Sequence, residues 1–320
     1  MTLVEEPVDI DKVIVQEDFS YGDHELQRLT VYHHFGEDAE AFQERKEGKG
    51  LFIIYIHGGA WRDPSITDKS FYPTIRALYS TAWQRELMNQ HVTGIASISY
   101  RLSAHPDHPQ DPATPSTERR DAQNPDHLQD VVASISFLQA RYAFGSRYLL
   151  VGHSCGATIA LQSLARGSMS LPEAIPFQNP EIIVGVAGIY DLRLLRDSHS
   201  HPVYQEFIAG AFGDDEKAWD SASPANLDLV EAWPEARTVV LASSSNDVLI
   251  DNGQIDCMGS KLATLSQKAR VLVLRDFLDI PHDAIWQKGV GMARVVAETL
   301  KFWEACDRAT GDAALRDGRD

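Results

Sequence analysis

The most informative segment of the chain reads Leu149-Leu150-Val151-Gly152-His153-Ser154-Cys155-Gly156-Ala157. An apolar run of strand type ends there in the pattern Gly-x-Ser-x-Gly, and an alanine-rich segment with helical spacing follows at once. This order of strand, sharp turn and helix raises the serine hydroxyl above the edge of a sheet and tolerates only small residues beside it. The helix that follows presents free backbone N–H groups and the positive end of its dipole at the same place. Ser154 is therefore the predicted nucleophile.

A second turn rich in glycine, His57-Gly58-Gly59-Ala60-Trp61, follows an apolar and β-branched run at residues 51–56. Such a run is typical of a strand that is buried on both faces. Two consecutive glycines allow the backbone to bend so that its N–H groups point into one space. We expect the N–H of Gly58 or Gly59, together with that of Cys155, to form an oxyanion hole.

Strands and helices alternate along most of the chain, and this predicts the α/β class, namely an α/β-hydrolase fold with a mostly parallel central sheet flanked by helices. All 320 residues are expected to form one domain, with a small cap insertion at 188–226 and flexible tails at 1–12 and 307–320. The predicted strands are 13–19 and 27–35 (an edge hairpin), 51–56, 92–100, 147–151, 182–187, 237–242 and 271–274. The predicted helices are 71–89, 128–142, a segment after Ser154, 203–212 and 284–305.

Candidates for a base and an acid follow two later strands, and the carboxyl ends of parallel strands are where functional groups gather. His282 would take the proton of Ser154, and Asp247 would orient the imidazole and stabilise its charged form. The order Ser154, Asp247, His282 is that of α/β-hydrolases. Asp251 stays open as an alternative acid, although Asp247 lies closer to its strand.

Composition limits the partners and the cofactors. The net charge of −17 argues against nucleic acid and anionic membranes as partners, so we expect a small-molecule substrate and leave a homodimer open. Three cysteines, no signal peptide and no membrane-length apolar run indicate a cytoplasmic protein. His105 and His108 lie in a proline-rich loop without nearby cysteines, so neither a metal nor another cofactor is expected.

Four motifs resemble those of serine-type kynurenine formamidases, the arylformamidases of the α/β-hydrolase superfamily. The resemblance covers residues 51–303 and rests on His57-Gly58-Gly59-Ala60-Trp61, Asn124-Pro125-Asp126-His127-Leu128-Gln129-Asp130, Gly152-His153-Ser154-Cys155-Gly156-Ala157 and His282-Asp283-Ala284-Ile285-Trp286. Most esterases similar to hormone-sensitive lipase have a third glycine where this chain has Ala60. The long loop at 103–124 departs from a compact version of the family and leaves the shape of the site entrance open.

The resemblance implies that the protein hydrolyses N-formyl-L-kynurenine to L-kynurenine and formate, in tryptophan catabolism and de novo NAD synthesis. Ser154, Asp247 and His282 match the triad positions of the family, and Gly58 and Gly59 match its oxyanion loop. Trp61, Tyr204 and Phe207 are hypothetical contacts of the aryl ring, and Trp61 could equally be a core residue. Two alternatives stay open: a short-acyl carboxylesterase, and a non-catalytic small-ligand receptor on the same fold.

Overall fold

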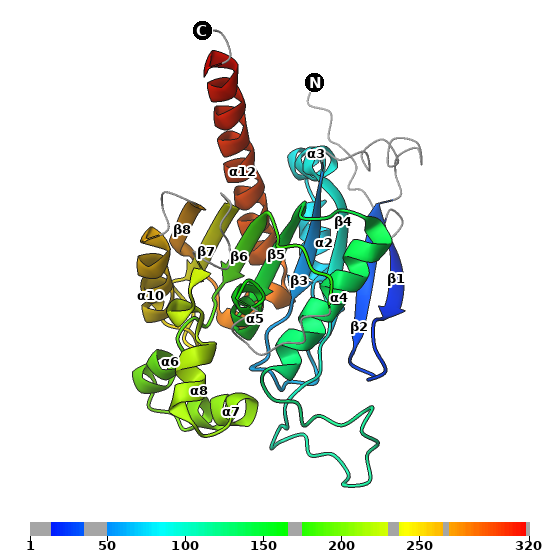
Figure 1. Ribbon diagram of the computed structural model, residues 1–320, viewed down its shortest axis with the longest axis vertical. Helices are drawn as coiled ribbons and strands as arrows, with labels where there is room; N and C mark the ends of the chain where they lie inside the picture. Colours follow the sequence, from blue (N-terminus) through cyan, green and yellow to red (C-terminus); the bar gives the residue numbers. More distant parts are fainter. Residues whose placement is uncertain (1–13, 35–49, 166–174, 230–236, 265–268, 318–320) are drawn as a thin grey trace.

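The computed structural model describes residues 14–34, 50–165, 175–229, 237–264 and 269–317, which are built around one eight-stranded sheet (Figure 1). The strand order is β1-β2-β4-β3-β5-β6-β7-β8. Neighbours from β4 to β8 run parallel, whereas β2 is antiparallel to both β1 and β4. The strands are β1 Ile14–Ser20, β2 Arg28–His34, β3 Leu51–Ile56, β4 Val92–Ile98, β5 Tyr148–His153, β6 Ile182–Val186, β7 Arg237–Ser244 and β8 Ala269–Leu278.

Helices cover both faces of the sheet and divide the core into two apolar clusters. One face carries α4 (Asp126–Tyr142), α5 (Cys155–Gln162) and α10 (Asn252–Ala263). The other face carries α2 (Tyr72–Leu78), α3 (Ala82–His91), α11 (His282–Gln287) and α12 (Val290–Asp317). This arrangement confirms the predicted α/β-hydrolase fold with a mostly parallel sheet.

The strand predictions are confirmed because the apolar runs are buried where parallel strands lie between two layers of helices. All six residues of β3 are buried, as are all six of β5. The edge hairpin of β1 and β2 pairs in the expected antiparallel register. The last strand is longer than predicted, because β8 continues past residue 274 to Leu278 beside Ser244 of β7.

Two predicted helices are interrupted. The stretch at 71–89 forms α2 and α3, since the Thr81 side chain accepts a hydrogen bond from the Gln84 N–H and starts a new helix. The stretch at 284–305 is divided between α11 and α12 at Gly289, whose φ is +71° and whose Cα packs against the backbone of Pro73. The prediction of one continuous helix at 71–89 and another at 284–305 is therefore wrong.

The segment predicted as a tail from residue 307 is helical as far as Asp317, where α12 ends. Alanine, arginine and leucine in this stretch favour helix, and extending an existing helix costs far less than starting one. Arg308 forms an ion pair with Glu304 one turn earlier. The other predicted tail, residues 1–12, lies outside the described residues. No described helix has both the length and the apolar character needed to cross a membrane.

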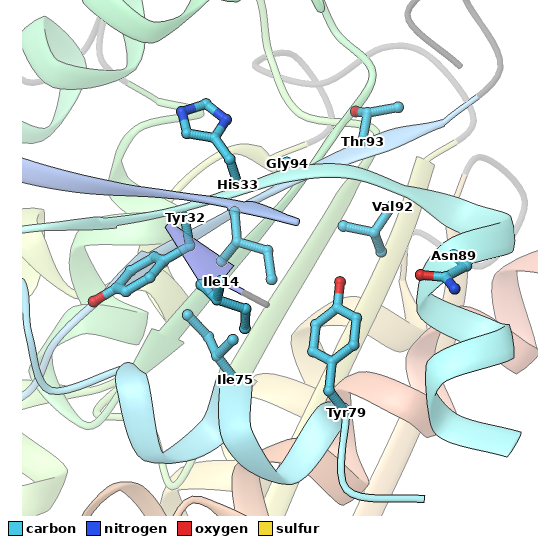
Figure 2. Close-up of a pocket in the computed structure, with 10 residues that line it drawn as sticks. Ile14, Tyr32, His33, Ile75, Tyr79, Asn89, Val92, Thr93 and Gly94 are labelled. Carbon is cyan, nitrogen blue, oxygen red and sulfur yellow. The ribbon is translucent and has the colours of Figure 1, made fainter. Parts of the chain in front are cut away.

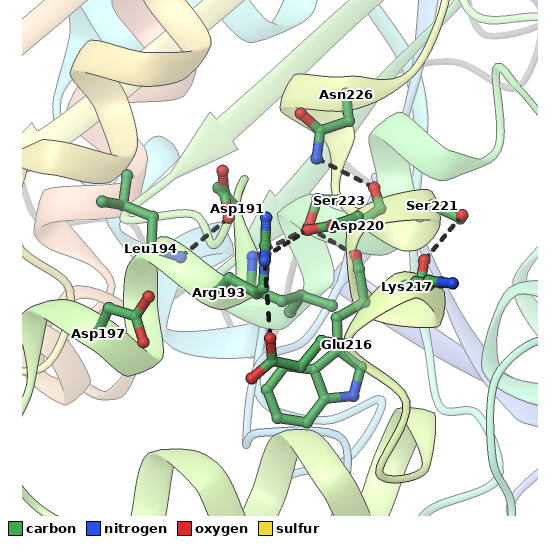
Figure 3. A network of polar contacts seen from close by, with 12 residues as sticks. Asp191, Arg193, Leu194, Asp197, Glu216, Lys217, Asp220, Ser221, Ser223 and Asn226 are labelled. Carbon is green, nitrogen blue, oxygen red and sulfur yellow. Dashed lines mark hydrogen bonds and ion pairs between the residues drawn. The ribbon is translucent and has the colours of Figure 1, made fainter.

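The segment predicted as a cap contains α6 (Leu192–Ser198), α7 (Val203–Phe212), α8 (Glu216–Ala222) and a short 3₁₀ helix, Pro224–Asn226. These elements gather at one end of the sheet, beside the long loop that follows β4 (Figure 1). Ion pairs connect them: Arg193 lies 3.6 Å from Glu216 and 2.7 Å from Asp220, which joins α6 to α8 (Figure 3). The loop itself has turns but no helix or strand, as predicted, and its Asn124 N–H donates to Ala211 O of α7.

A small hollow lies between β2, β4 and helices α2 and α3, lined by residues that include Ile14, Tyr32, Ile75 and Tyr79 (Figure 2). Its volume of about 20 Å³ is enough for one water molecule and too small for a substrate. None of the predicted site residues lines this hollow.

Candidate active site

Ser154 occupies the turn between β5 and α5 in a conformation that L residues rarely adopt, with φ 54° and ψ −124°. The strain is maintained by the surrounding backbone, because the Ser154 N–H donates to Val186 O of β6 at 3.0 Å. The side chain stands at the end of β5 and the residue is only 5% exposed. A buried hydroxyl on a strained turn is the arrangement that the sequence predicts for a nucleophile.

The two glycines of the turn are required by close packing, which confirms the reason given for them. A Cβ on Gly152 would lie 2.3 Å from Gly156 O, and one on Gly156 would lie 2.3 Å from Ile56 O. Any side chain at these positions would push α5 away from the ends of β3 and β5.

His282 and Asp247 are brought together by the structure. The Nδ1 of His282 lies 2.6 Å from Asp247 Oδ2, and the carboxylate can only accept, so the imidazole donates. The other oxygen, Oδ1, accepts from the backbone N–H groups of Leu249 and Ile250 at 2.9 Å each. Three hydrogen bonds therefore hold a carboxylate whose side chain is 1% exposed, and its orientation in turn fixes the imidazole.

Two serines at the end of β7, Ser244 and Ser245, join the loop of Asp247 to the loop of His282. Ser244 Oγ donates to Ile280 O at 2.6 Å and accepts from the Ile280 N–H at 3.0 Å. The Ser245 N–H donates to Leu278 O at 2.9 Å. This pairing positions two loops that are more than thirty residues apart in the sequence.

Asp251, the alternative acid, faces elsewhere. Its Oδ1 accepts from the Gly253 N–H at 2.6 Å and caps the N-terminus of α10. Its Oδ2 lies 3.6 Å from Nδ1 of His199, the residue that follows α6. The structure thus places Asp247, and not Asp251, against His282.

The predicted oxyanion loop turns back on itself beside the elbow. Gly59, Ala60 and Trp61 have φ values of 97°, 50° and 60°, three successive left-handed residues. The N–H groups of Arg62 and Asp63 both donate to Gly59 O at 2.9 Å, which closes the turn. Glycine adopts positive φ readily, whereas Ala60 takes this conformation with a Cβ in place.

Gly58 and Cys155, the other predicted oxyanion residues, lie where the loop meets the elbow. A Cβ on Gly58 would approach His153 Nδ1 to 2.9 Å and Ser154 Cβ to 3.1 Å, so only glycine allows this contact. The Cys155 Sγ accepts from the Trp61 N–H at 3.3 Å. Burial raises the pKa of the Cys155 thiol to about 11, which makes it a packing group rather than a second nucleophile.

The two histidines that flank the turns, His57 and His153, are buried. His57 stacks on Tyr100, with ring centroids 4.4 Å apart, and burial lowers its pKa to about 4. His153 packs against the His282 ring, with centroids 4.5 Å apart. Burial and the neighbouring His282 lower the pKa of His153 well below its usual value, so it stays neutral beside the catalytic candidate.

Ser154 and His282 line one pocket of about 280 Å³ at the end of the sheet under α7. Tyr204 and Phe207, two predicted substrate contacts, also line it, and the Tyr204 hydroxyl donates to Leu249 O at 2.9 Å. The remaining lining residues are Gly59, Ala60, Arg62, Asp63, Ile66, His105, Ile189, Val203, Leu249, Ile250 and Asp283. The mixture of apolar wall and a few polar groups is typical of a small-molecule site.

The third predicted contact, Trp61, is not among the lining residues. It is 1% exposed and packs beneath the pocket, with its ring 5.0 Å from Phe212 and 6.2 Å from Phe207. This burial favours the alternative of a core residue for Trp61 over a contact with the substrate. Its backbone is left-handed, with φ 60°, and its ring contacts two rings of α7.

Sequence reasoning missed Arg62 and His105, both of which line the pocket. Arg62 directly follows the Gly-Gly turn, so its proximity to the oxyanion loop was a usable signal. His105 comes from the long loop after β4, and nothing in the sequence places that loop over the site. No cluster of three or more His, Cys, Asp or Glu side chains that could hold a metal occurs within the described segments.

Several solved structures share the fold of this chain, and two of them are esterases. Esterase B of Lactobacillus rhamnosis is 15% identical with a TM-score of 0.64, covering 94% of this chain and 89% of that chain. The hyperthermophilic esterase of Pyrobaculum calidifontis is 17% identical with a TM-score of 0.55, covering 90% and 85%. These likenesses, together with the mostly parallel sheet, show that the chain has the α/β-hydrolase fold.

Proteins that are similar in sequence identify the family of the chain more narrowly than the solved structures do. A kynurenine formamidase-like hydrolase of Fusarium equiseti is 39% identical over 261 residues, which span 79% of this chain and 84% of that protein. Kynurenine formamidases of Aspergillus versicolor and Meyerozyma guilliermondii are 36% and 30% identical, and the alignments span 86% and 80% of them. No protein-family profile matches the sequence. The chain belongs to the kynurenine formamidase family, which confirms the predicted resemblance.

Proposed function

We propose that this hydrolase cleaves N-formyl-L-kynurenine to L-kynurenine and formate by covalent serine catalysis, as a kynurenine formamidase of tryptophan catabolism and de novo NAD synthesis. The observation that carries the proposal is the 2.6 Å contact between Asp247 and His282, since His282 lines one pocket with Ser154. Relatives of the chain are named kynurenine formamidases.

In this mechanism Ser154 Oγ attacks the formyl carbon while its proton passes to His282 Nε2. Backbone N–H groups of Cys155 and of Gly58 or Gly59 hold the oxyanion that forms. The intermediate collapses as His282 returns the proton to the departing arylamine nitrogen, which leaves formyl-Ser154. Water, deprotonated by His282, then releases formate and restores the serine. Asp247 keeps the imidazole in the tautomer that can accept at Nε2.

The active-site pocket suits an aromatic leaving group, since Tyr204 and Phe207 contribute aromatic surface to the pocket that Ser154 and His282 also line. The two rings lie 5.6 Å apart in a tilted arrangement and belong to the same helix, α7. An aryl group seated against them would keep its formamide nitrogen within the part of the pocket that Ser154 and His282 line.

The test is a spectrophotometric comparison of N-formyl-L-kynurenine with p-nitrophenyl acetate, using the wild type and Ser154→Ala. We expect a far higher kcat/KM for the formamide, a loss of about 10⁴- to 10⁶-fold in kcat in Ser154→Ala, and no effect of EDTA. Turnover of the ester alone would replace the proposal with a carboxylesterase. Turnover of neither substrate would leave a ligand-binding protein.

A further inference from the structure

We propose that Arg62 binds the carboxylate of the substrate and thereby selects substrates with an anionic amino-acid end. The inference rests on the proposed function, whose substrate carries an α-carboxylate, an ammonium group and an aryl ring. Arg62 is the single Lys or Arg among the described residues that line the pocket. A carboxylate that enters this pocket therefore has one fixed positive charge to pair with.

The backbone fixes Arg62 relative to the reacting centre. Its N–H donates to Gly59 O in the turn beside Ser154, so the guanidinium is carried by the predicted oxyanion loop itself. The side chain is 10% exposed, and the guanidinium carbon lies 5.9 Å from the centroid of the Phe207 ring. A cation with so little water around it gains from a second anionic partner.

Hydrogen-bond donors remain available on this guanidinium. Its Nη1 donates to Glu206 Oε1 at 2.7 Å, whereas Nε and Nη2 donate to no acceptor within the described residues. These two nitrogens form the side edge of the guanidinium, which binds a carboxylate through two parallel hydrogen bonds. Glu206 is 55% exposed, so water weakens its hold on Arg62.

Groups for the ammonium lie in the same pocket. Asp63, next to Arg62, and Asp283, next to His282, both contribute to its lining. One cationic group and two carboxylates in the same pocket complement the charges of an amino-acid end, with Tyr204 and Phe207 left for the aryl ring.

The test is calorimetric titration with two ligands, L-kynurenine and kynuramine, which is the same molecule without the carboxylate. The wild type should bind L-kynurenine more tightly. Arg62→Gln should raise the Kd for L-kynurenine roughly 10- to 100-fold and change that for kynuramine by less than about 3-fold.

Arg196→Gln is the matched control. Arg196 also donates to a glutamate, Glu216 at 2.6 Å, and lies over an aromatic ring, 5.3 Å from the Trp219 centroid, but it does not line the pocket. This variant should bind both ligands as the wild type does.

Glu206→Gln tests whether Arg62 binds the substrate carboxylate or only forms a structural ion pair with Glu206 between the oxyanion loop and α7. Removing this competing carboxylate should leave the Kd for L-kynurenine unchanged or lower it. The proposal is overturned if the wild type binds both ligands equally or binds neither. It is overturned equally if Arg62→Gln keeps the preference or weakens both ligands alike. Failure of the proposed function would appear separately, as no hydrolysis of N-formyl-L-kynurenine by the wild type.

Discussion

Replacing Asp247 by asparagine tests the candidate acid with almost no change in shape. The asparagine oxygen can still accept from the Leu249 and Ile250 N–H groups, which hold Oδ1 at 2.9 Å. That bond forces the new NH₂ group toward His282 Nδ1, 2.6 Å from the replaced oxygen. Two donors would then meet, so the imidazole must leave Nδ1 bare and carry its proton on Nε2.

An imidazole protonated at Nε2 cannot take the proton of Ser154. The equivalent change in serine proteases costs about 10⁴-fold, so we expect kcat for N-formyl-L-kynurenine to fall by roughly 10³- to 10⁴-fold, or about 4–5.5 kcal/mol of activation free energy. KM should change little, because the Asp247 carboxylate faces His282 and the backbone and is not among the groups that line the pocket. The assay is steady-state kinetics, with circular dichroism as a check of folding.

Asp251→Asn is the control, because asparagine can still cap α10 and this residue does not contact His282. Its kcat should remain within about 3-fold of the wild type. Wild-type activity in Asp247→Asn, or an equally large loss in Asp251→Asn, would refute the assignment of Asp247.

Three further predictions concern stability. The free energy of unfolding of Ser154→Gly should be about 1–2 kcal/mol higher than that of Ser154→Ala, since φ 54° with ψ −124° suits glycine alone. Equal urea midpoints for the two variants would argue against strain at this turn. Gly289→Ala should lower the free energy of unfolding by about 2 kcal/mol or more, because the new Cβ would lie 2.2 Å from the α2 backbone. Gly210→Ala, whose Cβ would meet no atom within 4 Å, should raise the free energy of unfolding by roughly 0.5–1 kcal/mol. Thermal denaturation measures both changes. Burial lowers the pKa of His57 to about 4 and that of His127 to about 3 from 6.5. Only the unfolded state therefore takes up these protons as the pH falls from 6.5 toward 4. Over this range the free energy of unfolding should decrease by about 1.4 kcal/mol per pH unit for each ring. His127→Gln should make that slope shallower in urea titrations, and an unchanged slope would contradict the assignment.

Most of the fold could be predicted because its determinants are local. A run such as residues 51–56 is apolar at every position, which only a strand between two helical layers requires. The turn at Ser154 needs small neighbours in immediate succession, and the sequence displays them. The interruptions of the helices were harder to predict, because the apolar spacing continues across Gly289 while the structure gives it a positive φ and packs it against Pro73, more than two hundred residues away.

Some features of the candidate site could likewise be predicted from the sequence, and others could not. The sequence by itself determined the candidate nucleophile, the glycine turns and the chain order of the candidate acid and base, since each depends on residue type beside a strand end. Only the tertiary structure decided between Asp247 and Asp251, turned Trp61 into the core and brought Arg62 into the pocket. Those outcomes depend on which loops pack together and on the left-handed backbone at 59–61, and contacts between distant segments leave no periodic or local pattern in a single chain.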